Sequence, residues 1–246
     1  MLTRQIGDCI LHTRTRDVDF SKDQIKIAQD FEKMIETLRY QRGVGIASNQ
    51  CADIEDPMRM TIIGTDNKEI RQAFAEAFPE ENLPLPFVMI NPEVLEYGQE
   101  TYYPDRGEGC LSVLGAIRGM VERYRSLTVR YFDFAGNEKT STFTGFPAHI
   151  VQHELDHINN GLLYLERILT DFSKKQKEDL LKYIQLHKEG NLEKENDKDP
   201  TQTLGFSFDR DEEGKVVFCP DAFKQILKQL SPEVISGIEQ KLQSFM

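Results

Sequence analysis

The chain has 246 residues, of which 30 are Lys or Arg and 41 are Asp or Glu, so its net charge is −11. This acidic balance argues against direct nucleic-acid binding, because no basic stripe is present to displace counterions from phosphates. Hydrophobic residues make up 39% of the chain, which is enough for a folded core. Its apolar runs are shorter than the roughly 18 residues that a membrane span needs. The first residues lack the features of a signal peptide, so we expect no membrane association.

The four cysteines are few and widely spaced, at positions 9, 51, 110 and 219. A disulfide framework needs a denser pattern, so a reducing compartment is the better interpretation. We therefore expect a cytoplasmic protein of bacterial type. An organelle, reached with a transit peptide that is later removed, is the alternative.

The first predicted element is a helix over residues 21–41, because apolar residues recur there at helical spacing. Ser21 is predicted to cap its start, and Gly43 and Gly45 are predicted to end it. The residues before it, up to Asp17, mix apolar and turn types and are expected to be irregular.

Strands and a polar insertion are predicted for the middle of the chain. Apolar and polar residues alternate on either side of an Ala-Gly-Asn-Glu turn at residues 135–138, which is typical of a hairpin. In chain order we predict a strand over 58–63, a polar and partly helical insertion over 67–86, a short strand over 87–90 that stops at Asn91-Pro92, and a hairpin whose strands cover 127–134 and 139–144.

The next segment returns to helical periodicity. A helix is predicted over 147–159, with Asn160-Gly161 as its C-terminal stop. A strand or coil over 162–168 and a second long helix over 173–188 follow.

After residue 188 the composition changes. Residues 189–200 are mostly charged or polar, as expected of a solvated linker. Apolar residues then return, and they predict a hairpin over 205–220 and helices over 221–230 and 232–245, the last of them capped by Ser231.

These boundaries suggest a main, catalytic domain over 1–188, a charged linker over 189–200 and a C-terminal α/β appendage over 201–246. The appendage is too small to rely on a core of its own. Its many apolar side chains should therefore cover a surface of the main domain, a second subunit or another protein.

The run His-Glu-Leu-Asp-His at residues 153–157 is the strongest chemical signal in the chain. Residues four apart on a helix face the same way, so His153 and His157 can bind one metal ion. Glu154 lies beside them and can accept a proton from a water molecule that the metal activates. The plainer interpretation is two surface histidines next to an acid, but one side of this helix is apolar, which favours a half-buried site.

A third metal ligand is needed, and the sequence offers two candidates. The extended metalloprotease pattern would place a histidine at position 163, where the chain has Leu163. Glu166 could serve instead, as in other metallopeptidases. Cys110, within the Glu-Gly-Cys-Leu-Ser run of residues 108–112, is the other candidate, although a free cysteine is more often a small buried apolar residue.

The run Gly-Val-Gly-Ile-Ala-Ser-Asn-Gln at residues 43–50 is a third candidate for a functional segment. Glycines allow a ligand to approach the backbone closely, and the Gln50 amide could donate to an oxyanion that develops during a reaction. A simple helix stop explains the glycines equally well. The run is not a phosphate loop, because no Lys-Ser or Lys-Thr pair follows it.

Together these three runs resemble the peptide deformylases. That family carries three ordered motifs, G-x-G-φ-A-x-x-Q, E-G-C-x-S and Q-H-E-x-D-H, where φ is apolar, and this chain has GVGIASNQ, EGCLS and QHELDH in the same order. Ile6-Gly-Asp8 and Ile90-Asn-Pro92 also resemble the family. The resemblance covers residues 1–188.

The resemblance implies an α+β fold with mixed or antiparallel strands around a central metal-binding helix that carries the HExxH motif. It implies that Cys110, His153 and His157 bind the metal and that Glu154 is the general acid and base. The Gln50 side chain and the Leu111 backbone N–H would hold the oxyanion. Two further groups are implied: an acid and its basic partner that brace the site, Glu108 and Arg123, and residues near the substrate, Gly45, Ile46, Arg118, Phe146, His149 and Ile150.

The implied function is that of a metal-dependent hydrolase that removes the N-formyl group from the N-terminal formylmethionine of nascent polypeptides, near the ribosome. Ferrous iron is the implied physiological metal, and a ligand set of one thiolate and two imidazoles suits zinc or nickel as well. Two alternatives are a deformylase-like protein that binds peptides or a partner without turnover, and a metallopeptidase that uses Glu166. A Cys110→Ala variant would separate the peptidase from the deformylase.

The chain departs from the family pattern at four positions, none of which removes a metal ligand or the general base. Ser48 stands where the family prefers Ala, Cys9 and Leu114 stand where Pro is usual, and His149 stands where many members have Arg or an apolar residue. His149 is therefore either part of the substrate pocket or a hydrogen-bonded structural residue.

Overall fold

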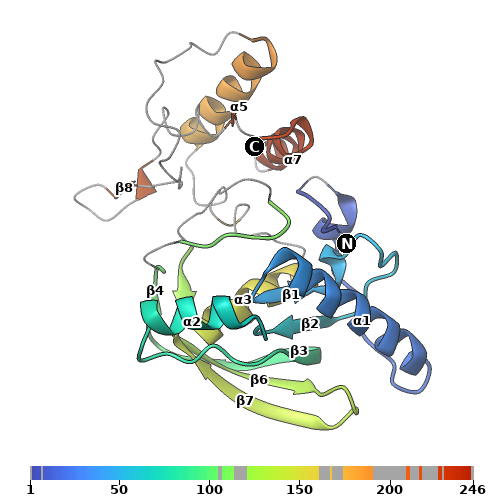
Figure 1. The fold of residues 1–246 in the computed structure, drawn as a ribbon. Helices are drawn as coiled ribbons and strands as arrows, with labels where there is room; N and C mark the ends of the chain where they lie inside the picture. The colour runs from blue at the N-terminus through green and yellow to red at the C-terminus, as the bar shows by residue number, and fades with distance from the viewer. Residues whose placement is uncertain are drawn as a thin grey trace. The chain divides into compact units, whose positions relative to one another are not determined.

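The computed structural model describes residues 2–6, 8–104, 107–113, 121–160, 167, 174–190, 209–210, 216–217, 227–228 and 230–244 (Figure 1). The chain divides into two compact units, which we treat one at a time. The first comprises Met1–Arg4, Asp8–Tyr102 and Glu122–Leu162, and the second comprises Gln5–Gly7, Tyr103–Val121 and Leu163–Met246. Within the described residues, no helix combines the length and the apolar character that crossing a membrane requires.

The first unit is built on a five-stranded antiparallel sheet. Its strand order is β1-β2-β3-β6-β7. Every second side chain of β6 is buried, at Leu127, Val129 and Tyr131, which is the pattern of a strand with one face on the core. The strands are β1 (Gly45–Ala47), β2 (Met60–Ile63), β3 (Phe87–Tyr97), β6 (Ser126–Phe132) and β7 (Glu138–Thr144).

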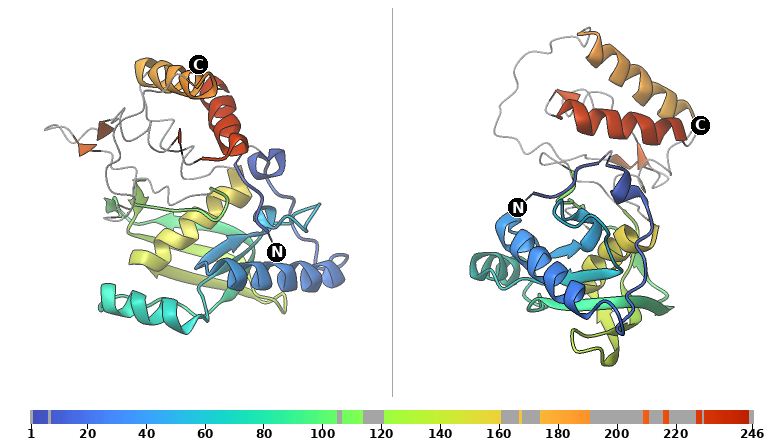
Figure 2. Two further views of the ribbon diagram at one scale, coloured as in Figure 1. Left: turned by 45° about the horizontal axis from the view of Figure 1, so that its top comes forward. Right: turned by 90° about the vertical axis from the view of Figure 1, so that its right-hand side faces the viewer.

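Helix α3 (Gly145–Asn160) lies across the strands of this sheet, as the left view of Figure 2 shows. Its apolar side chains, among them Val151, Leu155 and Ile158, belong to the same buried cluster as Met89 and Val129 of the sheet. The side of α3 that carries the His-Glu-Leu-Asp-His run is thereby fixed relative to β1 and β2. This packing is what positions the chemistry described below.

Two further helices and three short elements complete the first unit. Helix α1 (Gln24–Gln41) buries Ile27, Met34 and Leu38 and contacts β1. Helix α2 (Lys68–Ala77) is capped by Asn67, whose side-chain oxygen accepts the N–H groups of Glu69 and Ile70, both at 3.1 Å. The short elements are the 3-10 helices η1 (Cys9–His12) and η2 (Ser48–Gln50) and a ladder of β4 (Thr101–Tyr102) with β5 (Arg123–Tyr124).

The predicted cap of α1 was wrong. The hydroxyl of Ser21 donates to the Asp19 carboxylate at 2.6 Å, and the helix begins three residues later, at Gln24. The predicted end is confirmed, because α1 ends at Gln41 and Gly43 helps to close it. Arg42, with φ of 56°, takes the left-handed position, and Gly43 donates its N–H back to the carbonyl of Leu38.

The predicted stop at Asn91-Pro92 was wrong as well, because β3 continues to Tyr97. A shift of register between Ile90 and Glu93 absorbs the two residues as a bulge, where a proline needs no ladder partner. Asn91, at φ of 48°, secures the bulge with two hydrogen bonds to the backbone of Val18, at 2.8 and 2.9 Å.

Other predicted elements of the first unit are confirmed. The hairpin is formed by β6 and β7, the strand predicted from residue 58 begins at Met60, and the insertion contains α2. The helix predicted over 147–159 covers Gly145–Asn160. Its predicted stop at Gly161 and the strand or coil predicted over 162–168 lie outside the described residues, apart from helical Arg167.

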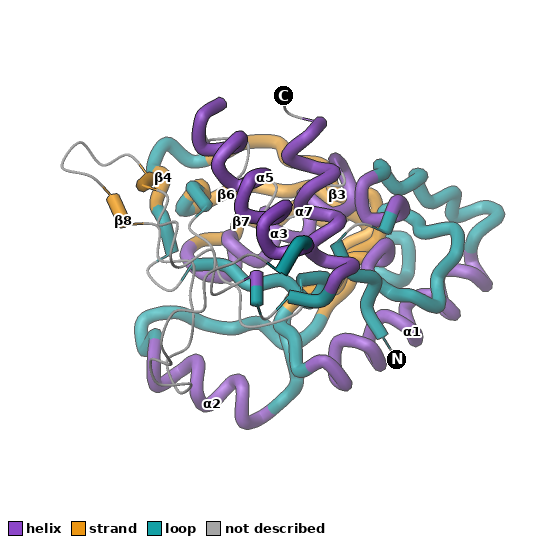
Figure 3. Tube along the Cα trace, turned by 90° about the horizontal axis from the view of Figure 1, so that it is seen from above, coloured by secondary structure: helices purple, strands orange, loops and turns teal. Residues whose placement is uncertain are grey.

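The second unit contains two helices that pack against each other, α5 (Lys174–Lys188) and α7 (Pro232–Ser244), drawn as neighbours in Figure 3. Lys188 of α5 forms an ion pair with Glu239 of α7. The Ser231 hydroxyl accepts the N–H of Val234 at 3.4 Å, as the predicted cap requires. Strands β8 (Asp209–Arg210) and β9 (Val216–Val217) form the predicted hairpin. The linker over 191–200 and most of the helix predicted over 221–230 lie outside the described residues.

Candidate metal centre

Helix α3 presents His153 and His157 on one face, one turn apart. Their ring centroids are 5.1 Å apart, and the side chains are buried, with 8% and 0% of the residue surface exposed. The opposite face of the helix supplies the core contacts with the sheet. A buried imidazole pair at this spacing is suited to bind one metal ion.

Cys110 lies in the segment 107–113, which two backbone hydrogen bonds fold into turns. Gly107 donates to the carbonyl of Pro104 at 2.7 Å, and Val113 donates to that of Cys110 at 3.1 Å. The N–H of Ser112 points at the Cys110 sulfur at 3.4 Å. This contact orients the Cys110 side chain, and the thiolate is the form of cysteine that binds metals.

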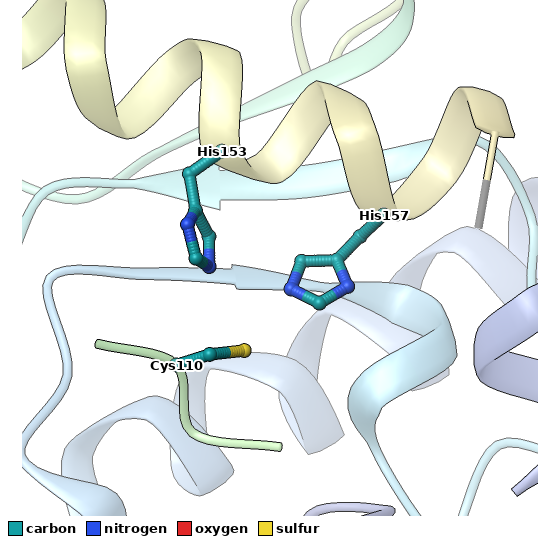
Figure 4. A group of neighbouring side chains, drawn as sticks. All are labelled: Cys110, His153 and His157. Atoms are coloured by element: carbon teal, nitrogen blue, oxygen red, sulfur yellow. The ribbon is translucent and has the colours of Figure 1, made fainter. Parts of the chain in front are cut away.

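The Cys110 sulfur and one imidazole nitrogen each of His153 and His157 lie within 4.8 Å of one another (Figure 4). In that view the two imidazoles extend from α3 toward the cysteine side chain. Zinc binds nitrogen and thiolate ligands at roughly 2.0–2.3 Å. One ion can therefore contact all three atoms, and three protein ligands leave the fourth coordination position of a tetrahedral site for water or substrate.

Glu154 is buried against the start of β1. A Cβ atom built on Gly45 would lie 2.5 Å from the Glu154 Oε1 atom and 2.8 Å from a methyl group of Ile150. Only 4% of Glu154 is exposed. Glycine is therefore the residue that lets the carboxylate lie this close to the strand, one residue along the helix from the candidate ligand His153.

Gln50 ends the 3-10 helix η2, directly after β1. Its side-chain oxygen accepts the N–H of Ala47 at 2.8 Å, which makes the NH₂ group the donating end of the amide. Its neighbour Asn49 donates to the backbone carbonyl of His157 at 2.8 Å, so this turn is attached to α3 at a candidate metal ligand. The turn also accounts for Ser48, whose buried hydroxyl donates to the carbonyl of Met58.

Comparison with known proteins identifies this arrangement. The family model described as polypeptide deformylase matches residues 3–175, a range that contains all three motif runs. The chain belongs to the peptide deformylase family. It is therefore a metal-dependent hydrolase of the peptide deformylase class.

Individual relatives agree. A peptide deformylase of Finegoldia magna is 33% identical over 172 residues, which cover 69% of this chain and 91% of that protein. A solved class I type b peptide deformylase of Acinetobacter baumannii, bound to Met-Ala-Ser, is 33% identical with a TM-score of 0.57 and covers 68% of this chain and 97% of its own. The deformylase of Thermotoga maritima is 30% identical with a TM-score of 0.53, over 67% of this chain and 95% of its own.

Two residues of the α3 motif, Gln152 and Asp156, were not assigned a role in the sequence analysis. Asp156 forms a buried ion pair with Arg123 at 2.8 Å. Gln152 exchanges two hydrogen bonds with the backbone of Tyr124, at 2.8 and 2.9 Å. Both contacts fix α3 to β5. The signal was present, because Gln and Asp are fixed letters of the Q-H-E-x-D-H motif.

Four other residues named in the sequence analysis are placed in part. Glu108 is buried, and its predicted pairing with Arg123 stays a prediction. The Leu111 carbonyl accepts a hydrogen bond from the Gln5 side chain at 3.2 Å. Arg118 and Glu166 lie outside the described residues.

The residues expected near the deformylase substrate cluster on β1 and the first turns of α3. Ile150 contacts the position of Gly45, and the next residue of β1, Ile46, is fully buried. Phe146 meets the His149 ring edge-on, with centroids 5.4 Å apart. His149 is therefore packed against an aromatic ring, whichever role it has.

Proposed function

We propose that this deformylase removes the formyl group from the N-terminal formylmethionine of nascent polypeptides, with Cys110, His153 and His157 as its metal ligands. The observation that carries the proposal is the approach of three ligand atoms to within 4.8 Å of one another, with Glu154 on the same turn of α3. Support for the substrate comes from the Acinetobacter baumannii relative, which was solved with a peptide that begins with methionine. We place the reaction in the bacterial cytoplasm, where formylated chains leave the ribosome.

When bound, the metal ion supplies a Lewis acid that polarises the formyl carbonyl and lowers the pKa of water. In the reaction, Glu154 accepts a proton from the attacking water at its carboxylate. The new bond joins the water oxygen to the formyl carbon, and the bond from that carbon to the methionine nitrogen breaks. Glu154 then gives the proton to the departing amine, so the products are formate and a free α-amino group.

Two donors stabilise the oxygen of the formyl group as it gains negative charge. The Gln50 NH₂ group is one, because its own carbonyl oxygen is engaged by Ala47. The Leu111 backbone N–H is proposed as the other. Donors held in place before the reaction avoid the cost of reorganisation, which is why such groups are effective in buried sites.

We assign substrate contacts to Gly45, Ile46, Arg118, Phe146, His149 and Ile150, and a bracing role to Glu108 with Arg123. Ferrous iron is the proposed metal, with zinc and nickel as alternatives that the same thiolate and imidazole ligands accept. We further propose that residues 1–188 form the catalytic domain and that 201–246, after the 189–200 linker, form an appendage.

The test is formate release from formyl-Met-Ala-Ser by the full chain, prepared without oxygen and loaded in turn with ferrous, nickel and zinc ions. Formate release should require metal, and ferrous iron should support it. Unformylated Met-Ala-Ser is the control substrate and should not be cleaved. Absence of formate with all three metals, at one bound ion per chain, would contradict the proposal and favour a protein that binds without turnover.

A further inference from the structure

Arg4 is a buried cation whose guanidinium donates to several backbone carbonyls of one loop. It is 7% exposed. It donates to the carbonyl oxygens of Asn49 at 3.2 Å, Ala52 at 3.2 Å and Ile54 at 2.7 Å, and also to that of Cys51. Burying a charge costs much free energy unless polar partners replace water, and here four carbonyl dipoles of one loop do so.

The backbone on either side of Arg4 is joined to the same loop. The Arg4 N–H donates to the carbonyl of Gln50 at 2.7 Å, and the N–H of Ala52 donates to that of Leu2 at 3.1 Å. Asp8 lies 3.5 Å from the Arg4 Nε atom, which steadies the guanidinium at its other edge. The carbonyls of residues 49–52 and 54 are thus all oriented by the N-terminal segment.

The same loop carries Gln50 and also contacts helix α3 of the proposed site. Gln50 bonds back to Ala47 through its side-chain oxygen, and Asn49 bonds to the carbonyl of His157. The loop itself is one 3-10 turn followed by irregular backbone. Such a segment has few hydrogen bonds of its own, so its buried carbonyls need outside donors to hold one conformation.

We propose that Arg4 is a positioning residue for deformylation: it holds the 49–54 loop so that the Gln50 amide stands ready at the developing oxyanion. The inference rests on the proposed function of Gln50. Arginine suits this role because its planar group carries five N–H donors that reach several carbonyls at once. The lysine ammonium has its three N–H donors on one nitrogen and cannot reach carbonyls that lie apart.

The test is a double-mutant cycle of Arg4→Lys and Gln50→Ala in the full chain, loaded with ferrous iron. Arg4→Lys should bind one metal ion and leave KM within about twofold, while kcat falls about 10- to 100-fold, the scale of a misplaced or lost oxyanion donor. In the Gln50→Ala background the same substitution should cost less than about twofold, because the donor it positions is gone. Arg39→Lys, in an exposed ion pair with Asp66, is the matched control and should be unchanged.

Two results would overturn the proposal. One is wild-type kcat in Arg4→Lys, and the other is an undiminished loss of kcat when Arg4→Lys is added to Gln50→Ala. Arg4→Gln is the second variant, interpreted in the same way if the lysine variant does not fold.

Amide hydrogen exchange separates this inference from the proposed function. If the wild-type protein releases no formate, the proposed function fails, and Arg4 is then tested by exchange alone. Arg4→Lys should speed exchange at residues 47–54 and leave the amides of α3 protected. Unchanged exchange at 47–54 would show that Arg4 does not hold the loop.

Discussion

Gly45 and Glu154 are in such close contact that a Cβ atom on the glycine would lie 2.5 Å from the carboxylate oxygen. The contact joins the first motif run to the third, through strand β1 and helix α3. It also explains why the first run needs glycine at this position, which the helix-stop interpretation did not require. The Glu154 carboxylate, which is proposed to move the proton, therefore occupies space that any side chain larger than that of glycine would fill at position 45.

Gly45→Ala should lower kcat at least about tenfold, because Glu154 and Ile150 must shift and small displacements of a catalytic group are costly. Metal content should stay near one ion per chain, since no metal ligand is touched. Ala73→Ser, at an exposed position of α2, is the control. Wild-type kcat in Gly45→Ala would show that the carboxylate tolerates displacement.

Glu154→Gln should retain the metal and lose at least about 100-fold in kcat, the scale of a positioned acid and base. The amide keeps the size of the side chain and removes its ability to accept a proton. Steady-state kinetics and metal analysis of the same sample measure both effects. Glu80→Gln, on the exposed surface, should match the wild type, and near-normal turnover in Glu154→Gln would exclude this residue from proton transfer.

Cys110→Ala should lose metal binding or weaken it sharply, because the variant removes the proposed sulfur ligand. Cys51→Ala is the matched control: burial raises the pKa of the Cys51 thiol to about 12, and this cysteine is not part of the proposed ligand set. Metal content by mass spectrometry decides the question. Stoichiometric metal in Cys110→Ala would point to a different third ligand, such as Glu166.

Glu81 accepts a hydrogen bond from the N–H of Phe146, at the first turn of α3. A carboxylate at a helix N-terminus stabilises it by satisfying an N–H group and by opposing the helix dipole. Glu81→Ala should therefore destabilise the protein by about 1 kcal/mol, seen as a lower Tm. Glu80→Ala, whose side chain is exposed, should leave Tm unchanged, and equal Tm values for the two variants would argue against this cap.

The sequence predicted those features that depend on residue type and local spacing. His153 and His157 are four residues apart on a helix whose periodicity is plain, so their convergence follows from local geometry. The proposed chemistry of Glu154 and Cys110 follows from their side chains. The runs that carry them were recognised because each has a chemical use.

The errors arose where distant residues decide the local conformation. A strand passes through Asn91-Pro92 because Asn91 bonds to Val18, 73 positions away. Arg4 binds carbonyls 45 to 50 positions away, and nothing in its neighbourhood in the sequence marks it. Such contacts exist only in the folded chain, so pattern and propensity could not find them.

The proposed division into a 1–188 domain and an appendage can be tested by truncation, because it separates α5 from α7, on which it packs. Leu180 and Ile184 are fully buried on α5, and α7 buries Val234 and Leu242 in the same unit. Truncation after Gly190 removes α7 and leaves the two α5 side chains without that cover. Each is worth roughly 1.5–3 kcal/mol when buried, so Tm and solubility should fall.

Metal content and kcat of the truncated chain should nevertheless persist, because the proposed ligands and general base all lie between Cys110 and His157. Replacing Leu180 and Ile184 by Gln in the truncated chain is the control, and it should restore solubility by removing the exposed apolar surface. Equal stability of the full and truncated chains would mean that the tail serves a binding partner instead. Loss of metal on truncation would contradict the proposed boundary, since residues 191–246 would then be needed to form the metal site.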